Sequence, residues 1–352
     1  MSDYPNLSNV PPLVSVSVLI PVYNEAAHLE RVAGAMLDQQ FDGAVEYLFV
    51  DGRSTDSSRA ILEALAQRDP RVRVLDNPAR GTTAGLNIAL KAARGEIIAR
   101  MDAHTTYPAD YLAIGVQRLR QGGALQVSGP SIATGGGGWS DAVALALNGV
   151  FGTGGAAYRH TRPEEFEVDS GFLGVWLRTT LIDAGGWDEQ WVADEDYELA
   201  ARLRKDGGTL VCVPEMAASY MPRDTPGRLA RQYWRYGFYR PMTARRHPES
   251  MRHSHAAPPM LVLAACASLV GPRRTRLLGR AGVAAWLVAS LGVSGRARMH
   301  GAPARDAIRL PAVFAVMHYS YGLAFLAGCM RQGVPLAGLR GLLSRRTQRL
   351  AS

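Results

Sequence analysis

The 352-residue chain contains only three cysteines and lacks any lysine after Lys205. Cys212, Cys266 and Cys329 are far apart and lie in apolar surroundings, which does not match a disulfide framework or a metal-ligand spacing. This use of cysteine favours a reducing compartment. Residues 1–13 lack the basic start and apolar run of a secretion signal, so we expect an N-terminal tail and a first domain that stays in the cytoplasm.

Charge is divided unevenly along the chain, whose formal net charge is +8. From Arg223 onward there are 21 arginines and three acidic residues, whereas the first 220 residues hold 18 basic and 28 acidic residues. A basic last third behind an acidic part predicts contact with an anionic surface. Nucleic acid is the alternative partner, but the interleaved apolar runs favour a membrane, and we expect no nucleic acid.

The first hundred residues alternate between strand and helix patterns. Strands are predicted at 13–21, 44–52, 71–76 and 96–102, and helices at 25–40, 54–68 and 83–93. Such an order predicts an α/β fold with a mainly parallel, Rossmann-like sheet and flanking helices, and 47% hydrophobic content suffices for its core. Ligands of such sheets bind in the crevice at the carboxyl ends of the strands.

Two aspartates end predicted strands and are candidates for ligand binding. Asp51, in "LFVDGRSTD", could accept a hydrogen bond from a nucleotide base, although Asp-Gly is also a common turn pair. Asp102, in "ARMDAHTTYP", is followed two positions later by His104, and the two side chains project to one side of an extended chain. Asp102 has the same alternative as a turn residue.

A cluster of acidic residues begins a predicted helix in "GGWDEQWVADEDYELAARLRKDG". Asp194 is placed to cap the helix, and Glu198 and Arg202 are expected to pair on its exposed face. Mutual repulsion raises the proton affinity of Glu195 and Asp196, while the helix N-terminus favours their charged forms, so a carboxylate here could act as a base. The alternative is that all three acids only cap and solvate the helix.

The predicted helix 225–245 interleaves arginines with aromatic residues in "RDTPGRLARQYWRYGFYRPM". Arginine forks match phosphate oxygens and rings suit sugar or lipid faces, so a diphosphate-bearing ligand and an interfacial anchor are the two interpretations. Residues 122–157 are rich in glycine, which predicts a loop or lid; the run lacks the context of a phosphate-binding motif.

Three apolar segments follow, at 258–271, 277–295 and 310–330. The first is short for a span of about 20 residues, the second is borderline and the third is long enough. Every connector is basic, so the distribution of positive charge does not choose an orientation. We expect residues 256–335 to be membrane-associated helices and 336–352 a basic tail; interfacial insertion, true spans and burial in a soluble helical subdomain remain alternatives.

Five motifs, in order, resemble those of the family 2 inverting glycosyltransferases of GT-A fold: "VSVLIPVYNE", "LFVDGRSTD", "ARGEIIARMDAH", the acidic cluster and "RQYWRYGFYR". The resemblance covers about residues 14–245, so a catalytic domain is expected at 14–250. "MDAH", "GTGGAAYR", "DEDYELAARLR" and "RQYWRYG" look most like the succinoglycan-type membrane-associated glucosyltransferases of bacterial exopolysaccharide synthesis.

The resemblance implies a role for each matching position, and these are Pro21, Tyr23, Asn24 and Glu25 in the nucleotide loop, Asp51 at uracil, Asp102 and His104 at the D-x-D metal motif, Asp196 as general base beside Glu195, and Gln232, Trp234 and Arg235 in the Q-x-x-R-W acceptor and diphosphate motif. This chain departs from the family pattern at two places. Gly52 stands where a second aspartate is usual, and the D-x-D is D-x-H.

The resemblance also implies an activity. It is the transfer of a hexose, glucose from UDP-glucose, to a polyprenyl-diphosphate-linked sugar, assisted by divalent Mn or Mg, at the cytoplasmic membrane with the catalytic domain facing the cytoplasm. Other polysaccharide assembly proteins are further expected partners. Transfer to polyprenyl phosphate itself is the near alternative, and a non-catalytic membrane assembly protein that binds nucleotide sugars is an alternative of another class.

Overall fold

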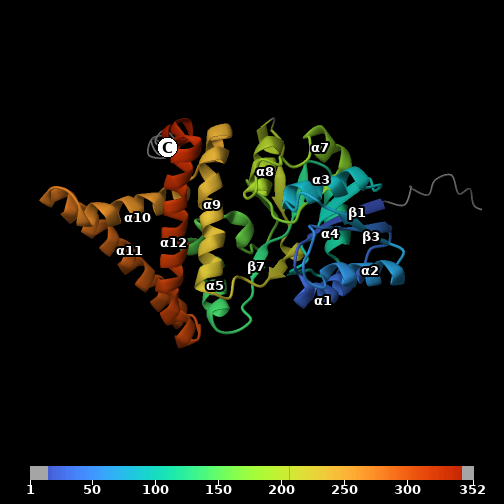
Figure 1. Ribbon diagram of the computed structural model, residues 1–352, viewed down its shortest axis with the longest axis horizontal. Helices are drawn as coiled ribbons and strands as arrows, with labels where there is room; N and C mark the ends of the chain where they lie inside the picture. Colours follow the sequence, from blue (N-terminus) through green and yellow to red (C-terminus); the bar gives the residue numbers. More distant parts are fainter. Residues whose placement is uncertain (1–14, 206, 343–352) are drawn as a thin grey trace, which may run out of the picture.

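The chain begins with alternating strands and helices, and these strands form one half of a large sheet (Figure 1). The computed structural model describes residues 15–205 and 207–342, so the predicted tail 1–13 and most of the tail 336–352 lie outside them. The opening elements are β1 (Ser15–Val22), α1 (Ala26–Leu37), β2 (Ala44–Asp51), α2 (Ser58–Arg68), β3 (Val72–Asp76), α3 (Thr82–Ala92) and β4 (Ile97–Arg100). Strand β1 pairs in parallel with β2 and β4, and β2 with β3, which confirms the predicted alternation.

Both faces of this sheet are covered by helices because its side chains alternate between them. Val18 and Ile20 pack in the cluster with α1, α2 and α4 (Tyr111–Arg120), whereas Leu19 packs with α3, α7 (Arg178–Asp183) and α8 (Glu195–Lys205). All three of these β1 residues have no exposed surface. The carboxyl ends of β1, β2 and β4 therefore meet at one edge, held in place from both sides.

The second half of the sheet is mixed. The strand order is β3-β2-β1-β4-β9-β6-β10-β8, in which β9 (Val175–Leu177) lies antiparallel between β4 and β6 (Gln126–Ser128). Strand β10 (Leu210–Cys212) is parallel to β6 and antiparallel to β8 (Phe166–Glu167). A smaller sheet joins β5 (Thr105–Thr106), β11 (Ala218–Tyr220) and β7 (Ser131–Ala133), and η3 (Pro214–Met216) connects β10 to β11.

The glycine-rich segment 122–157, predicted to be a loop or lid, is largely structured. It contains β6, β7, α5 (Trp139–Leu147) and α6 (Val150–Thr153), and η2 (Ala157–Arg159) ends it. Helix α5 packs on the C-terminal helix α12 (Ala304–Gln332) through an apolar cluster that includes Val143 and Phe314. The glycines of residues 135–138 remain a loop, but burial of α5 decided the structure of the rest.

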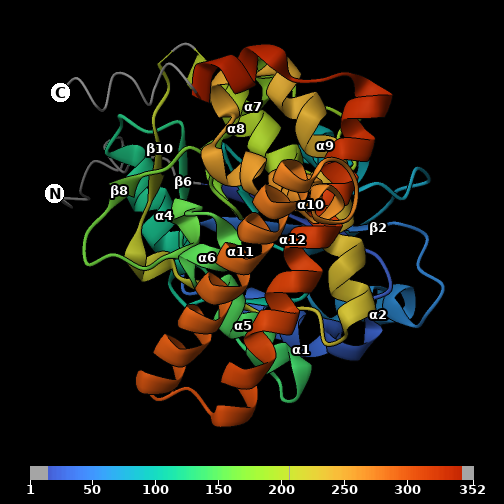
Figure 2. The same cartoon turned by 90° about the vertical axis from the view of Figure 1, so that its left-hand side faces the viewer.

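Helices α9 (Pro226–Arg246) and α12 run side by side, between the large sheet and the helices of residues 253–299 (Figures 1 and 2). Their backbones come close at two glycines. A Cβ added to Gly237 would lie 2.3 Å from the carbonyl oxygen of Tyr321, and one added to Gly328 would lie 2.4 Å from that of Phe238. These contacts permit no side chain at either position without displacing a helix.

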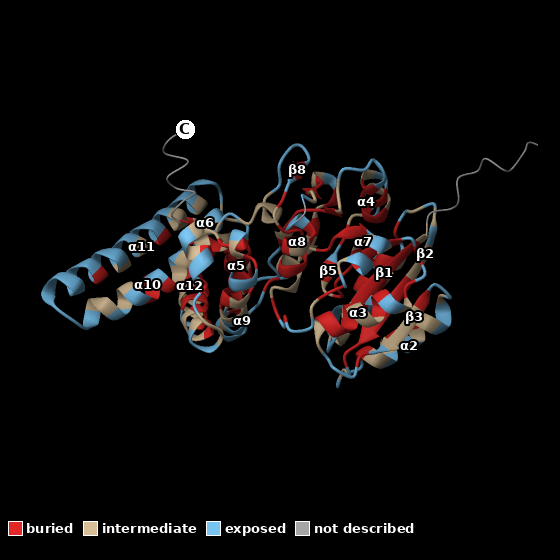
Figure 3. Cartoon of the chain, turned by 90° about the horizontal axis from the view of Figure 1, so that it is seen from above, coloured by how far each residue is buried: buried red, intermediate tan, exposed pale blue. Residues whose placement is uncertain are grey.

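Helices α10 (His253–Leu269) and α11 (Arg273–Met299) follow η4 (Pro248–Ser250) and form a hairpin that projects away from the large sheet (Figures 1 and 3). Its exposed apolar residues include Leu263, Leu277 and Leu291, and basic residues such as Arg274 stand at its turn. Helices α11 and α12 are long and apolar enough to cross a membrane, with 11% and 39% of their most apolar windows buried in the protein.

Candidate active site

The loops that follow β1 and β2 are tied together at the carboxyl edge of the sheet. Asn24 adopts a left-handed conformation (φ 55°), which Asn tolerates better than most residues. Its Oδ1 accepts a hydrogen bond from the backbone N–H of Thr55 at 2.7 Å, and its own N–H donates to Ser54 Oγ at 3.0 Å. The N–H of Glu25 donates to Ser58 Oγ at 2.9 Å. The first loop is therefore positioned by the second.

Asp51 ends β2 beside this pair of loops. Its residue is 6% exposed, its Oδ1 accepts from the N–H of Ser54 at 3.2 Å, and the strand pairing sets it opposite Val22. Pro21 is paired in parallel with Val50, and Tyr23 is 48% exposed at the surface of the same edge. Pro21 and Tyr23, two of the predicted nucleotide-loop residues, thus lie at the same edge as Asp51, and the exposed ring of Tyr23 is available to a planar ligand.

Asp102 lies just beyond the end of β4, and a buried arginine holds its carboxylate. Arg100 Nε donates to Asp102 Oδ1 at 3.0 Å and Nη2 to Oδ2 at 3.4 Å. The side chains of Arg100 and Asp102 are 4% and 9% exposed. The hydroxyl of Tyr107 accepts from the Asp102 N–H at 2.6 Å, which fixes the backbone that follows the strand.

The same arginine reaches the acidic start of α8. Arg100 Nη1 lies 2.6 Å from Asp196 Oδ1 and 3.5 Å from Glu195 Oε1, and Trp187 Nε1 donates to Asp196 Oδ1 at 3.4 Å. Burial raises the pKa of Asp196 to about 7; the Arg100 charge opposes the rise, and the charge of Glu195 adds to it. A carboxylate with such a pKa is poised to accept a proton near neutral pH.

The His104 side chain contacts Glu25. His104 Nδ1 lies 3.3 Å from Glu25 Oε1, on the β1 side of the edge. Burial disfavours the protonated ring, but the hydrogen bond to Glu25 and the charge of Asp102 outweigh it and raise the pKa of His104. In residues 15–205 and 207–342, no three His, Cys, Asp or Glu side chains are grouped so that they could hold a metal ion.

Two residues at this centre were given no role from the sequence, Arg100 and Trp187. A signal for Arg100 was present, since a charged residue inside an otherwise apolar strand is buried only when it is paired. The expectation that Asp194 caps α8 with its side chain is not what the structure has. Its carboxylate instead binds Arg240 Nη2 at 2.7 Å and accepts from Thr243 Oγ1 at 3.3 Å, because α9 packs against this loop.

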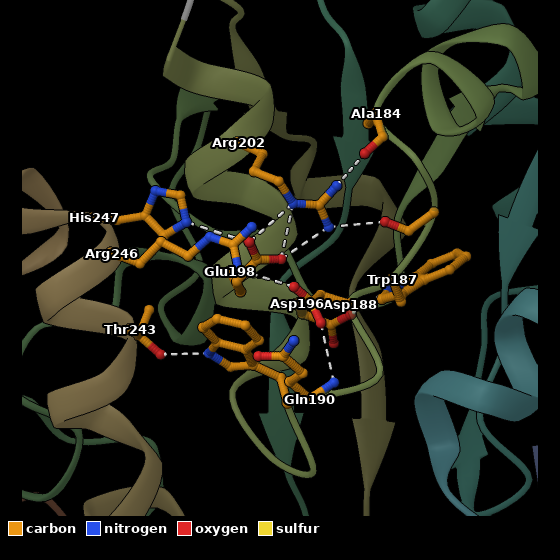
Figure 4. A network of polar contacts seen from close by, with 12 residues as sticks. Ala184, Trp187, Asp188, Gln190, Asp196, Glu198, Arg202, Thr243, Arg246 and His247 are labelled. Carbon is orange, nitrogen blue, oxygen red and sulfur yellow. Dashed lines mark hydrogen bonds and ion pairs between the residues drawn. The ribbon is translucent and has the colours of Figure 1, made fainter. Parts of the chain in front are cut away.

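The other side of α8 is fastened to α9 by a polar network (Figure 4). Glu198 pairs with Arg202 as predicted, at 2.8 Å, but the pair is not on an exposed face, since Glu198 is fully buried. His247 Nε2 also contacts Glu198, at 3.2 Å, and Arg202 donates to the carbonyl oxygens of Ala184 and Gly186. Helix packing converted an expected surface pair into a buried connection.

The predicted acceptor motif lies on α9, and its Arg235 contacts the loop that precedes α8. Arg235 Nη2 donates to the carbonyl oxygen of Val192 at 2.8 Å, which supports the segment leading to Asp196. Gln232 Nε2 donates to the hydroxyl of Tyr236 at 3.0 Å. Trp234 is 45% exposed, so its ring is open to a ligand.

Comparison with known proteins gives relatives and a fold. The model of "Glycosyl transferase family 2" matches residues 17–172. The succinoglycan biosynthesis protein ExoA of Rhizobium meliloti (strain 1021) is 33% identical over 231 residues, which are 62% of this chain and 67% of that protein. The Methanococcus voltae dolichyl N-acetyl-alpha-D-glucosaminyl phosphate 3-beta-D-2,3-diacetamido-2,3-dideoxy-beta-D-glucuronosyltransferase is 22% identical over 234 residues, 63% of this chain and 71% of that one.

Among solved structures, the mannosyltransferase PcManGT of Pyrobaculum calidifontis, in complex with GDP-Man and Mn²⁺, superposes with a TM-score of 0.56 at 20% identity, covering 88% of this chain and 87% of that one. This likeness shows the fold, a GT-A-like α/β domain with a mainly parallel central sheet. Together with the identity to ExoA over two thirds of its length, the matches establish the family. The chain belongs to glycosyltransferase family 2.

Proposed function

We propose that this glycosyltransferase moves a hexose, glucose from UDP-glucose, with inversion onto a lipid-linked saccharide in bacterial exopolysaccharide synthesis. The observation that carries the proposal is the position of Arg100, which contacts both Asp102 and Asp196. One side chain therefore contacts both Asp102, the carboxylate assigned to the diphosphate, and Asp196, the proposed base. Relationship to ExoA, whose name gives succinoglycan biosynthesis, supports the choice of polymer class.

Donor binding is assigned to the edge formed by β1, β2 and β4. Asp51 is placed to accept a hydrogen bond from the base of the nucleotide, and Pro21, Tyr23 and Glu25 form the wall beside it. Asp102 and His104 are assigned to the diphosphate, and Glu25, whose hydrogen bond raises the pKa of His104, favours this ring as a donor to phosphate oxygen. The Asn24 loop, fixed to Thr55, holds this wall in place before the donor arrives.

The residues present fit a divalent cation that binds with the donor and is held only in part by the protein. Mg²⁺ and Mn²⁺ sites of this kind use one or two carboxylates and complete their shell with phosphate oxygens and water. Asp102 would be the main ligand. His104 would be either the donor to phosphate described above or, as the neutral imidazole, a second ligand, and imidazole suits Mn²⁺ better than Mg²⁺. When bound, such a cation neutralises the charge that develops on the departing diphosphate.

Asp196 is assigned the role of general base. Its pKa of about 7 and its position at the start of α8 suit removal of a proton from an acceptor hydroxyl. Arg100 and Trp187 hold one carboxylate oxygen, Oδ1, so Oδ2 is left to receive the proton. The hydroxyl oxygen attacks the anomeric carbon opposite the leaving diphosphate, and this single displacement inverts the configuration.

The acceptor is assigned to the α9 side, where Trp234 is exposed, Arg235 contacts the loop that leads to Asp196, and Gln232 contacts Tyr236. The apolar α10–α11 hairpin and α12 support membrane contact, with arginines at the connectors for anionic headgroups. We place the catalytic domain on the cytoplasmic side, where nucleotide sugars are made, with other polysaccharide assembly proteins as partners at the membrane. The M. voltae relative, by its name, acts on a dolichyl phosphate-linked sugar, which supports a lipid-linked acceptor.

The test is transfer of radiolabelled sugar by membranes that contain the protein, with a panel of UDP- and GDP-sugars and Mg²⁺, Mn²⁺ or EDTA. We expect UDP-glucose to be used, and Asp196→Asn to reduce transfer by about 10²- to 10⁴-fold while UDP binding persists. Asp188→Asn is the matched control, because the Asp188 carboxylate binds Arg246 at the surface. Full activity of Asp196→Asn would refute the assignment of the base.

Analysis of the lipid product separates the proposal from its near alternative. A saccharide extended by one residue on a diphosphate lipid is the expected product. A monosaccharide on polyprenyl phosphate would instead identify a polyprenyl-phosphate sugar transferase, and absence of transfer with every donor, despite UDP binding, would favour a non-catalytic assembly protein.

A further inference from the structure

Arg159, at the end of η2, lies in a group of four tyrosines contributed by three parts of the chain. Its guanidinium carbon lies 5.2 Å from the ring centroid of Tyr158 and 5.7 Å from that of Tyr220, and Nη1 donates to the Tyr220 hydroxyl. Tyr233 and Tyr236, on α9, are close enough to interact electrostatically with the same guanidinium. We call these five residues the Arg159 cluster.

The arginine of this cluster has no acidic partner. Within residues 15–205 and 207–342, no carboxylate lies within 4.0 Å of the Arg159 nitrogens. The buried arginines Arg100 and Arg240 differ, since Arg100 contacts Asp102 and Asp196, and Arg240 contacts Asp194. Arg159 is half-buried and has no counter-charge beside it, so it can pair with an anion from outside the described chain.

The tyrosines can supply further hydrogen bonds to an anion. Burial raises the pKa of Tyr236 to about 12 and that of Tyr233 further, so both hydroxyls stay protonated at neutral pH. The Tyr236 hydroxyl already accepts from Gln232 Nε2 at 3.0 Å, which leaves its own proton for another acceptor. A guanidinium fork surrounded by neutral O–H donors, with no carboxylate beside it, matches the oxygens of a phosphate group.

The cluster lies between the proposed donor site and the apolar helices. Tyr220 is paired with Thr105 across β11 and β5, and Thr105 directly follows His104. Tyr233 packs against apolar side chains of α5 and α12, Phe314 among them. The Arg159 cluster therefore also borders these two helices. An anion bound here would have the proposed sugar-transfer centre on one side and apolar helices on the other.

We propose that the Arg159 cluster binds a phosphate group of the polyprenyl-linked acceptor. The choice of a lipid as the source of the phosphate rests on the proposed function; the phosphate chemistry rests on the cluster itself. The donor nucleotide is the other source of a phosphate, because Tyr220 of the cluster pairs with Thr105, next to His104. Binding of the acceptor phosphate would hold the lipid while its sugar extends toward Asp196.

The test is binding of farnesyl diphosphate, farnesol and UDP with Mn²⁺ to the full-length protein in detergent, by isothermal titration calorimetry. We expect Arg159→Gln to weaken binding of farnesyl diphosphate at least tenfold, with farnesol and UDP affinities unchanged. Arg159→Lys, which keeps the charge but loses the fork, is expected to recover part of the affinity. Arg162→Gln is the matched control, because Arg162 lies in the same segment, is exposed and stacks on Phe166.

Each outcome decides the proposal. Equal farnesyl diphosphate binding by wild type and Arg159→Gln would overturn it, and a loss of UDP affinity alone would assign the phosphate to the donor and overturn it as well. A thermal melt shows whether Arg159→Gln is folded; if it is not, the Tyr236→Phe variant, which removes one donor, replaces it with the same expected direction. Because these measurements need no turnover, a protein that fails the transfer assay but binds farnesyl diphosphate through Arg159 would refute the proposed function and retain this inference.

Discussion

Replacing Arg100 by glutamine tests the electrostatic coupling at the centre of the proposed site. The variant removes the cation that lies 2.6 Å from Asp196 and also holds Asp102. It keeps hydrogen-bonding groups, on a shorter side chain. The Arg100 charge favours the ionised form of Asp196, so its removal must raise the pKa of Asp196 above its value of about 7. A base acts only when deprotonated. As the pH is lowered, the variant should therefore lose activity at a higher pH than the wild type does.

The size of the change follows from the distance and the shielding. Two unit charges 4 Å apart interact by about 4 kcal/mol at an effective dielectric constant of about 20, and one pKa unit corresponds to about 1.36 kcal/mol. The Coulomb energy corresponds to a change of about 3 in the pKa of the carboxylate. An adjacent arginine lowers the pKa of an aspartate by about 1–3. The side chains of Arg100 and Asp196 are 4% and 18% exposed, so solvent screens the pair weakly. We therefore expect the acidic limb to move from about pH 7 to between about pH 8 and 10.

The assay is the pH dependence of kcat/KM for the acceptor, which reports ionisations of the free enzyme. Arg118→Gln is the control, because Arg118 pairs with Glu165 at the surface and its loss should leave the limb near pH 7. Arg100→Lys retains the charge and should return the limb part of the way. A limb for folded Arg100→Gln that stays at the wild-type pH, or moves lower, would refute the reasoning; circular dichroism verifies the fold.

Three further predictions concern the metal, the helix contact and a buried ion pair. His104→Asp should shift the preferred cation from Mn²⁺ toward Mg²⁺ in transfer assays, and an unchanged preference would leave His104 only a role toward phosphate. Gly237→Ala should destabilise the protein by about 1–3 kcal/mol, seen as a lower Tm, whereas Gly227→Ala, which meets open space, should not. Arg240→Met should lower the free energy of unfolding by about 3–5 kcal/mol at pH 8, measured by denaturant unfolding. The loss should be smaller at pH 5, because burial raises the pKa of Asp194 and its carboxylate can then take up a proton. An equal loss at both pH values would contradict this reasoning.

Local sequence patterns sufficed for the catalytic half because its signals are local. The apolar run of β1 and the helix periodicity of α1 lie within short windows, and the ends of β2 and β4 follow from where their apolar runs stop. The placement of Asp51 and Asp102 at one edge then follows from the parallel order, and the structure has it. The roles assigned to these carboxylates stay predictions.

Contacts between distant segments were not predictable in the same way. Arg100 and Asp196 are 96 positions apart, and only the packing of α8 on the sheet brings them together. Glu198 carries the pattern of a surface residue, but α9 covers it. The glycine-rich segment was misjudged for the same reason, since α5 is formed by a tertiary partner, α12, that lies more than 150 residues later.

The close backbone contact of α9 with α12 at Gly237 and Gly328 has a mechanical consequence. Helix α9 also holds Asp194, two positions before Asp196, so a continuous series of contacts runs from this carboxylate to α12. Under the membrane placement proposed for α12, this contact between two helix backbones would fix the distance of Asp196 from the bilayer surface. The terminal sugar of a lipid-linked acceptor would then have to lie at that distance from the bilayer to react. A saccharide that is longer or shorter would have to tilt or bend.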